Sequence, residues 1–226
     1  MNQSILVVAA HPDDEALGCG GAIALYAQTG ADVHVVFMTD GVNSRGNVKK
    51  FEVEQRRSAA REASNILGAQ APIFLSFPDN AMDTVSLLDI IKSLEKIINQ
   101  LKPQIIYTHH SDDLNIDHQI THQAVMTACR PQPNSTVREI FSFEVLSSTE
   151  WSIGSKNLFK ANCFVDIDSV KEKKIASINA YEKEMREFPH SRSIESVEAL
   201  ITLRGSSVGL ASAEGFMLNR MLRSID

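Results

Sequence analysis

The chain has 226 residues, of which 43% are hydrophobic, enough apolar material for one sizeable core. Its net charge of −6 argues against nucleic acid or an anionic membrane surface as the main partner. The three cysteines, Cys19, Cys129 and Cys163, lie too far apart to indicate a disulfide framework or a paired-cysteine metal site. With no signal sequence or membrane-spanning run in view, we expect a cytoplasmic protein.

The first 145 residues alternate between strand and helix patterns. Apolar runs predict strands at 5–9, 33–38, 73–77, 105–108 and 140–143. Helices are predicted at 16–28, 52–67, 86–101 and 118–128, and polar loops at 39–51 and 110–117. This alternation predicts an α/β fold with a Rossmann-like, doubly wound, mostly parallel sheet in the strand order 3-2-1-4-5.

The alternation stops after about residue 145. Residues 163–167 are predicted to form an edge strand, 170–185 a helix and 188–193 a loop, and the remainder is expected to be mainly helical. We therefore expect a single domain over 1–226, with a core at about 1–145 and a mixed C-terminal extension at 146–226.

Two polar stretches follow strands that the predicted order makes neighbours. The turn His11-Pro12-Asp13-Asp14-Glu15 comes directly after the first strand, and the stretch from Thr108 to His118 comes at the end of the fourth. The chain reverses its direction of growth between these two strands, which creates a crevice at their carboxyl ends. The topology thus predicts that both stretches lie at one site.

The residue types in these stretches favour a metal centre. Two histidines and one carboxylate are the usual protein contribution to a catalytic zinc site, so we expect His11, Asp14 and His118 to bind one zinc or a similar divalent ion. Asp117 is suited to orient a ligand or catalytic histidine. Asp13 diverges from its neighbour Asp14 and is better suited to act as a general base. Rivals of His118 as the third ligand are His109, His110 and His122.

A simpler interpretation is that Asp13 and Asp14 only cap the first helix, where carboxylates are favoured by free N–H groups and the dipole. The second cluster at the adjoining strand argues against it. His109 and His122 are more typical of packed, hydrogen-bonded histidines than of ligands. The basic residues of the second helix, Arg56, Arg57 and Arg61, are compatible with a solvated face.

The first motif and the Gly18-Cys19-Gly20-Gly21 run after it resemble the signature of the PIG-L/LmbE family of zinc-dependent de-N-acetylases. Asp117-His118 resembles the second motif of that family, and Ala213-Glu214-Gly215-Phe216 resembles its tail. The resemblance implies one zinc and hydrolysis of an N-acetyl group on an N-acetylglucosamine-like sugar or conjugate. It assigns the two histidines, His11 and His118, and Asp14 to zinc, and Asp13 to base catalysis.

One position departs from the resemblance. Many members of the family have a histidine three residues before the last zinc ligand, used to stabilise the oxyanion or protonate the amine, where this chain has Asn115. Asn115 can donate a hydrogen bond to an oxyanion but cannot supply a proton at neutral pH. The general acid is then a histidine, His110 first and His190 second, or Asp13 after it has taken the water proton.

Four further residues are expected to bind substrate. Arg57 resembles a family position that faces the substrate, and Asp79 follows the third strand at the same sheet edge. His190 and Arg192, in the C-terminal loop, are expected to shape the substrate mouth. The expected partners are a small amino-sugar substrate and further copies of the chain, with no nucleic acid and no integral membrane segment.

Two other function classes stay open. A dinucleotide-binding oxidoreductase is disfavoured because the glycines do not form G-x-G-x-x-G and two carboxylates at the turn would repel a pyrophosphate. An inactive metal-binding relative is favoured only by Asn115.

Overall fold

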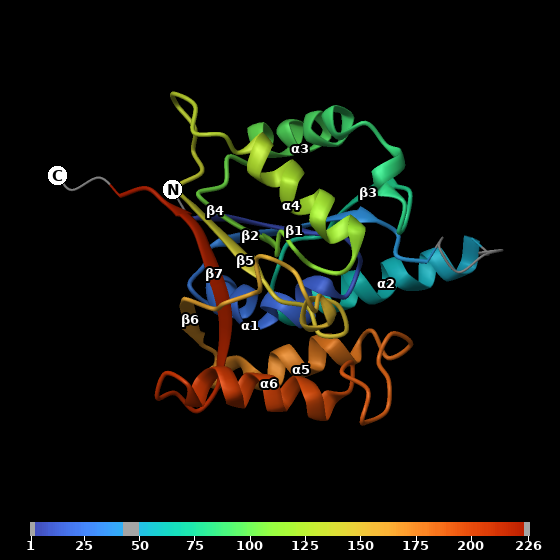
Figure 1. Cartoon of the computed structure of the whole chain (residues 1–226), viewed down its shortest axis with the longest axis vertical. Helices are drawn as coiled ribbons and strands as arrows, with labels where there is room; N and C mark the ends of the chain where they lie inside the picture. Colours follow the sequence, from blue (N-terminus) through green and yellow to red (C-terminus); the bar gives the residue numbers. More distant parts are fainter. Residues whose placement is uncertain (1–2, 43–49, 224–226) are drawn as a thin grey trace.

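The computed structural model describes residues 3–42 and 50–223, and its described strands form a seven-stranded sheet in the order β3-β2-β1-β4-β5-β7-β6 (Figure 1). The strands are β1 Ser4–Ala9, β2 Asp32–Thr39, β3 Ile73–Phe77, β4 Ile105–His109, β5 Glu139–Phe143, β6 Cys163–Asp166 and β7 Ala213–Met221. The first five are parallel, and β7 pairs antiparallel with both β5 and β6. The predicted α/β class and the order 3-2-1-4-5 are confirmed.

Helices cover both faces of the sheet. They are α1 Asp14–Gln28, α2 Lys50–Leu67, α3 Leu87–Leu101, α4 Ile116–Ala128, α5 Lys171–Asn179 and α6 Ile194–Ser206. Figure 1 shows α3 and α4 on one face and the other four on the opposite face. No helix in the described part of the chain is long and apolar enough to cross a membrane.

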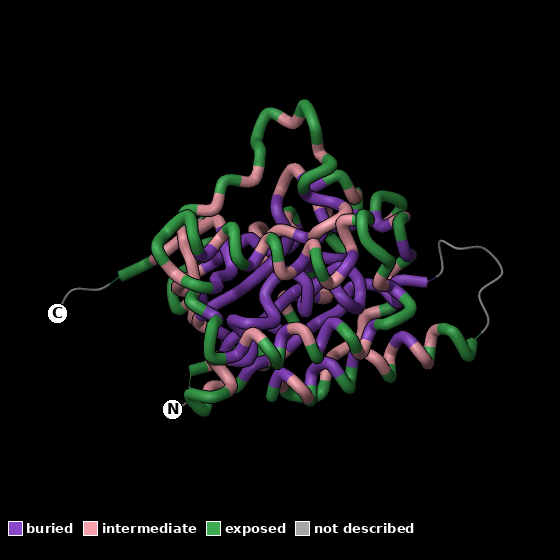
Figure 2. The backbone as a smooth tube through the Cα atoms, turned by 90° about the horizontal axis from the view of Figure 1, so that it is seen from below, coloured by how far each residue is buried: buried purple, intermediate pink, exposed green. Residues whose placement is uncertain are grey.

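Strand β1 has no polar face because both of its faces are covered. Leu6 and Val8 belong to the core under α3 and α4, whereas Ile5, Val7 and Ala9 belong to the core under the other helices. A parallel strand buried on both sides is expected to be a continuous apolar run, which is the pattern in the sequence. Figure 2 shows the buried backbone gathered at the centre of the molecule.

The end of the chain differs from the prediction of mainly helix. α6 ends at Ser206, and residues 213–221 form β7, which lies between β5 and β6. Phe216 is fully buried, with its ring centroid 5.0 Å from that of Tyr107 on β4. Burial of Phe216 against the sheet outweighs the weak helical pattern, and the expected edge strand at 163–167 is confirmed as β6 beside it.

Three boundaries are also corrected. α1 begins at Asp14 rather than near Ala16, so Asp14 and Glu15 belong to the helix and Asp13 directly precedes it. α5 ends at Asn179, six residues before the predicted end, and the chain then turns so that Tyr181 packs beneath the acidic turn. Of the loop predicted at 39–51, residues 43–49 lie outside the described part, and α2 already begins at Lys50.

Candidate active site

Hydrogen bonds within the turn between β1 and α1 stabilise its conformation. The backbone N–H of His11 donates to Asp14 Oδ2 over 2.8 Å, and the N–H of Asp13 donates to Glu15 Oε2 over 3.0 Å. Asp13 has φ 124°, a backbone region that residues other than glycine rarely adopt. Strained backbone of this kind concentrates at functional sites, where the surrounding contacts maintain it.

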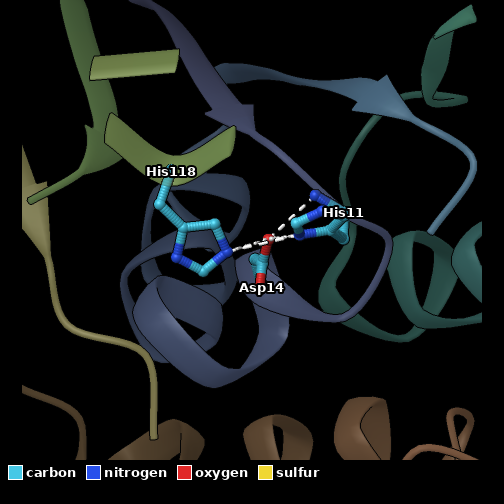
Figure 3. A group of neighbouring side chains, drawn as sticks. All are labelled: His11, Asp14 and His118. Carbon is cyan, nitrogen blue, oxygen red and sulfur yellow. Dashed lines mark hydrogen bonds and ion pairs between the residues drawn. The ribbon is translucent and has the colours of Figure 1, made fainter. Parts of the chain in front are cut away.

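The three predicted metal ligands lie together (Figure 3). His11 Nδ1 is 3.2 Å from Asp14 Oδ2, and His118 Nε2 is 3.3 Å from both Asp14 Oδ2 and His11 Nδ1. All three residues are buried, and one ligand atom from each lies within 4.8 Å of the others. A turn at the end of β1 and the first turn of α4 thus supply two imidazoles and one carboxylate to a single point.

The outer nitrogen of each histidine faces a carboxylate. His11 Nε2 lies 3.1 Å from Asp117 Oδ2 and 3.3 Å from Asp79 Oδ1, and His118 Nδ1 lies 3.1 Å from Asp113 Oδ1. A carboxylate at the outer nitrogen holds the proton there and leaves the inner nitrogen as a metal ligand. Asp117 is itself fixed, because its two oxygens accept the N–H groups of Asn80 and Met82.

The charge at this point is negative unless cations balance it. Burial opposes a charged His118, but the carboxylates of Asp14 and Asp113 outweigh burial and raise its pKa to about 9. Burial likewise opposes a charged His11, yet its contacts with Asp117, Asp14 and Asp79 raise the pKa of His11 well above its usual value. The carboxylates around both imidazoles therefore favour positive charge at this point, which a divalent cation can supply.

An unpartnered oxygen supports the same conclusion. Asp14 Oδ1 is buried and has no hydrogen-bond partner among the described residues, although Asp14 Oδ2 is crowded by three histidines. A buried carboxylate oxygen without a partner is costly in a folded protein. The donor set, its outer-sphere carboxylates and this oxygen together fit a divalent metal ion.

Asp13 stands beside the metal ligands with its two oxygens in different surroundings. Its Oδ2 is 2.8 Å from Arg192 Nη1 and 3.2 Å from Arg56 Nη2. Its Oδ1 is buried without a partner among the described residues. The ion pairs fix the orientation of the carboxylate and leave one oxygen available.

Arg56 also pairs with Glu184, and both residues line a cavity of about 590 Å³. None of the predicted metal ligands lines this cavity.

Glu15 supports the turn from below. Its Oε1 accepts the Tyr181 hydroxyl over 2.6 Å, and its Oε2 accepts the N–H of Asp13. Burial raises the pKa of Glu15 to about 8. Its hydrogen bonds to the Tyr181 hydroxyl and the Asp13 N–H hold the shape of the turn.

Other residues named from the sequence lie in distinct surroundings. His110 Nε2 is 2.7 Å from the carbonyl oxygen of Asn157, and Asn115 caps α4 by accepting the N–H of Asp117 while its amide nitrogen donates to Asn80. Arg57 pairs with Asp40 over 2.8 Å, while its neighbour Arg56 reaches Asp13.

Sequence reasoning missed three supporting groups. Asp113 holds His118 but follows another aspartate in a polar loop, so its sequence gives no distinguishing signal. Arg56 precedes Arg57 on α2, and only the structure shows which of the two side chains reaches Asp13. Glu214 was noted only as part of a resemblance, without a role.

Glu214 and Lys174 join the two halves of α1, which is interrupted at Cys19 (φ −146°, ψ 23°). The Glu214 carboxylate accepts the N–H groups of Gly21 and Ala22, each over 2.8 Å. Lys174 Nζ donates to the carbonyl oxygen of Leu17 over 2.7 Å and to Glu214 over 2.6 Å. The buried pair thereby satisfies backbone groups that the interruption frees, and holds the segment that carries Asp14.

We expect Glu214→Gln to lower the free energy of unfolding by about 3–5 kcal/mol, because it leaves the buried Lys174 ammonium uncompensated. Urea unfolding followed by circular dichroism measures this loss. The control is Glu54→Gln, which breaks an exposed ion pair with Arg61 and is expected to cost about 0–1 kcal/mol. Equal stabilities of the two variants would contradict this role of the pair.

This chain shares sequence and fold with several known proteins. Residues 6–129 match the model of the PIG-L family, described as GlcNAc-PI de-N-acetylase. The chain is similar to the uncharacterized deacetylase YaiS of Escherichia coli, with 36% identity over 151 residues that cover 65% of this chain and 76% of the relative.

Two solved structures share the fold over nearly the whole chain. One is N,N′-diacetylchitobiose deacetylase of Pyrococcus horikoshii, with a TM-score of 0.77, 21% identity and coverage of 96% of this chain and 84% of the relative. The other is GalB of Pseudomonas putida, a 4-carboxy-2-hydroxymuconate hydratase, with a TM-score of 0.79, 25% identity and 99% coverage of both chains.

Proposed function

The chain belongs to the PIG-L family, and from this premise we propose that it is a zinc-dependent hydrolase of the N-acetyl group on an N-acetylglucosamine-like sugar or sugar conjugate. The observation that carries the proposal is the convergence of His11, Asp14 and His118, with Asp13 beside them. The family description and the named deacetylases among the relatives support the amide of an amino sugar as the reacting group.

The donor set favours zinc. Two imidazoles and one carboxylate leave a position open in a tetrahedral zinc site. Bound there, the cation would supply Lewis-acid chemistry, polarising the amide carbonyl and acidifying the attacking water.

Asp13 is the general base in this proposal. Arg192 and Arg56 hold its Oδ2, so Oδ1, which has no partner among the described residues, is the oxygen that accepts the water proton. The carboxylic acid formed in this way can then return the proton to the amine nitrogen as the C–N bond breaks. One residue thereby serves as base and acid in turn.

Asp13 is favoured as the general acid over Asn115 and His110. Asn115 cannot supply a proton, and His110 Nε2 lies against the Asn157 carbonyl oxygen. We expect His110→Ala and His190→Ala to lower turnover by far less than the roughly 10²–10⁴-fold typical of a general acid or base. Initial rates at saturating substrate, with metal content checked, measure this. A loss of that size in either variant would make its histidine the acid.

The substrate and the metal dependence are tested together. Acetate release is measured from N-acetylglucosamine, N,N′-diacetylchitobiose and an N-acetylated nucleotide sugar, with added zinc and with a chelator. We expect at least one substrate to release acetate, the chelator to abolish release and zinc to restore it. Zinc-loaded protein that releases no acetate from any of them would contradict the proposal.

A second candidate is the addition of water to a carbon–carbon double bond of a carboxylate substrate. Similarity to the hydratase GalB over 99% of both chains favours it. Loss of ultraviolet absorbance of a conjugated enoate, without acetate release from any sugar, would establish this alternative.

Three expectations stay predictions: the division into a core at 1–145 and an extension at 146–226, the homo-oligomer and the cytoplasmic location. The dinucleotide-binding alternative has little support, because Asp13, Asp14 and Glu15 occupy the turn where a pyrophosphate would bind.

A further inference from the structure

Trp151, the single tryptophan of the chain, has no part in the chemistry proposed above, yet its side chain is conspicuously open to solvent. It ends a short helical turn, Thr149–Trp151, and the residue is 46% exposed. Its ring meets the imidazole of His190 edge to face, with centroids 5.9 Å apart and planes at 73°. A large indole left half-exposed is more typical of a binding surface than of a core.

One chain of contacts leads from this ring to the general base. The N–H of Arg192 donates to His190 Nδ1 over 3.0 Å, and Arg192 Nη1 lies 2.8 Å from Asp13 Oδ2. Two residues of the loop after α5, His190 and Arg192, therefore link Trp151 to Asp13 through these contacts.

A second chain of contacts leads from the same turn to a predicted metal ligand. Thr149 Oγ1 donates to Asp113 Oδ2 over 2.6 Å, and Asp113 Oδ1 lies 3.1 Å from His118 Nδ1. Ser148 also donates to Asp113. Since Asp113 is bonded both to His118 and to the start of the turn, the position of Trp151 is fixed relative to the predicted metal centre.

The surroundings of the indole combine an apolar face with polar groups. The imidazole of His190 lies beside the indole, and Glu150 is next to Trp151 in the turn, with its carboxylate accepting the N–H groups of Ser147 and Ser148. A pyranose ring presents the same combination, with C–H groups on its faces and hydroxyls around its edge.

We propose that Trp151, with His190 beside it, forms a stacking subsite for a second pyranose ring, joined to the sugar whose N-acetyl group is removed. The inference rests on the proposed function, because the acetylated ring must lie at Asp13 and the predicted metal centre. It makes the preferred substrate a disaccharide or larger glycoconjugate rather than a free monosaccharide.

The first test uses the fluorescence of Trp151, which is the only indole in the chain. The zinc-loaded Asp13→Asn variant, which binds sugar without consuming it, is titrated with N,N′-diacetylchitobiose and, separately, with N-acetylglucosamine. The disaccharide is expected to shift or quench the emission at concentrations where the monosaccharide has no effect. Emission that responds to neither sugar, or equally to both, would overturn the subsite.

The second test uses selectivity. For Trp151→Ala, kcat/KM for the disaccharide relative to the monosaccharide is expected to fall about tenfold, the factor that corresponds to 1.4 kcal/mol and to a good aromatic contact. Trp151→Phe keeps a planar ring and should recover part of this ratio. Ile153→Ala, a neighbouring change at a residue that is 92% exposed, should leave the ratio unchanged. An unchanged ratio in Trp151→Ala would overturn the proposal.

The outcomes separate the subsite from the function. If no sugar is deacetylated but the disaccharide alone alters the emission, the hydrolase proposal fails, while Trp151 is still shown to bind a disaccharide. If sugars are deacetylated and both tests show no preference of Trp151 for the disaccharide, the function stands and the subsite fails. Emission that responds only to phospholipid vesicles would replace the sugar by a membrane surface.

Discussion

Replacement of His118 by alanine is expected to remove the bound metal and with it all measurable turnover. His118 supplies one of three ligand atoms at a buried point, and Asp14 cannot hold a divalent ion there with only one imidazole. His11→Ala is expected to give the same loss. Zinc content per chain after gel filtration, with activity measured on the same sample, provides the test.

His122→Ala is the matched control, since His122 lies one turn further along α4. Its Nδ1 is 2.8 Å from the carbonyl oxygen of His109, and it belongs to neither group of possible metal ligands found among the described residues. We expect this variant to retain zinc. Full zinc occupancy in His118→Ala or His11→Ala, or equal loss in all three variants, would contradict the ligand assignment.

Asp13→Asn is expected to retain zinc while turnover falls by about 10²–10⁴-fold. The substitution keeps the size of the side chain and leaves the three ligands intact, but it removes the group that accepts the water proton. Initial rates and zinc content are measured on the same preparation, and thermal unfolding shows whether the ion pairs with Arg192 and Arg56 were needed for folding.

Asp112→Asn is the control for this loss. Asp112 also carries a carboxylate near the end of β4, but it is bonded to Ser155 and, within the described part of the chain, forms no hydrogen bond or ion pair with Asp13 or the three ligands. We expect its turnover to stay close to that of the wild type. A modest loss in Asp13→Asn, with an acidic limb of the pH–rate profile that matches the wild type, would count against Asp13 as the base.

The central part of the site could be predicted because topology and chemistry coincide there. The apolar runs at 5–9 and 105–108 are typical of buried parallel strands, and the doubly wound strand order makes them neighbours whose carboxyl ends meet at one edge, as β1 and β4 do. The histidines and carboxylates directly after these strands then had to come together. The sequence thus predicts that His11, Asp14 and His118 lie at one point, and the structure places them together.

The supporting groups could not be predicted because their roles depend on contacts between residues that are far apart in the sequence. Arg56 and Arg57 are adjacent in the sequence, and only the packing of α2 decides that Arg56 reaches Asp13 while Arg57 pairs with Asp40. Strand β7 was missed because the burial of Phe216 between neighbouring strands is a tertiary effect that overrides local pattern. Glu214, carried by that strand, was missed with it.

The most direct test of the central claim is the anomalous scattering of a zinc-loaded crystal, measured on both sides of the zinc absorption edge. The structure offers two groups of three ligands that share His11: one with Asp14 and His118, the other with Asp79 and Asp117. We predict a single peak about 2.0–2.2 Å from His11 Nδ1, an Asp14 carboxylate oxygen and His118 Nε2. A peak at His11 Nε2, between Asp79 and Asp117, with none at Asp14, would contradict it.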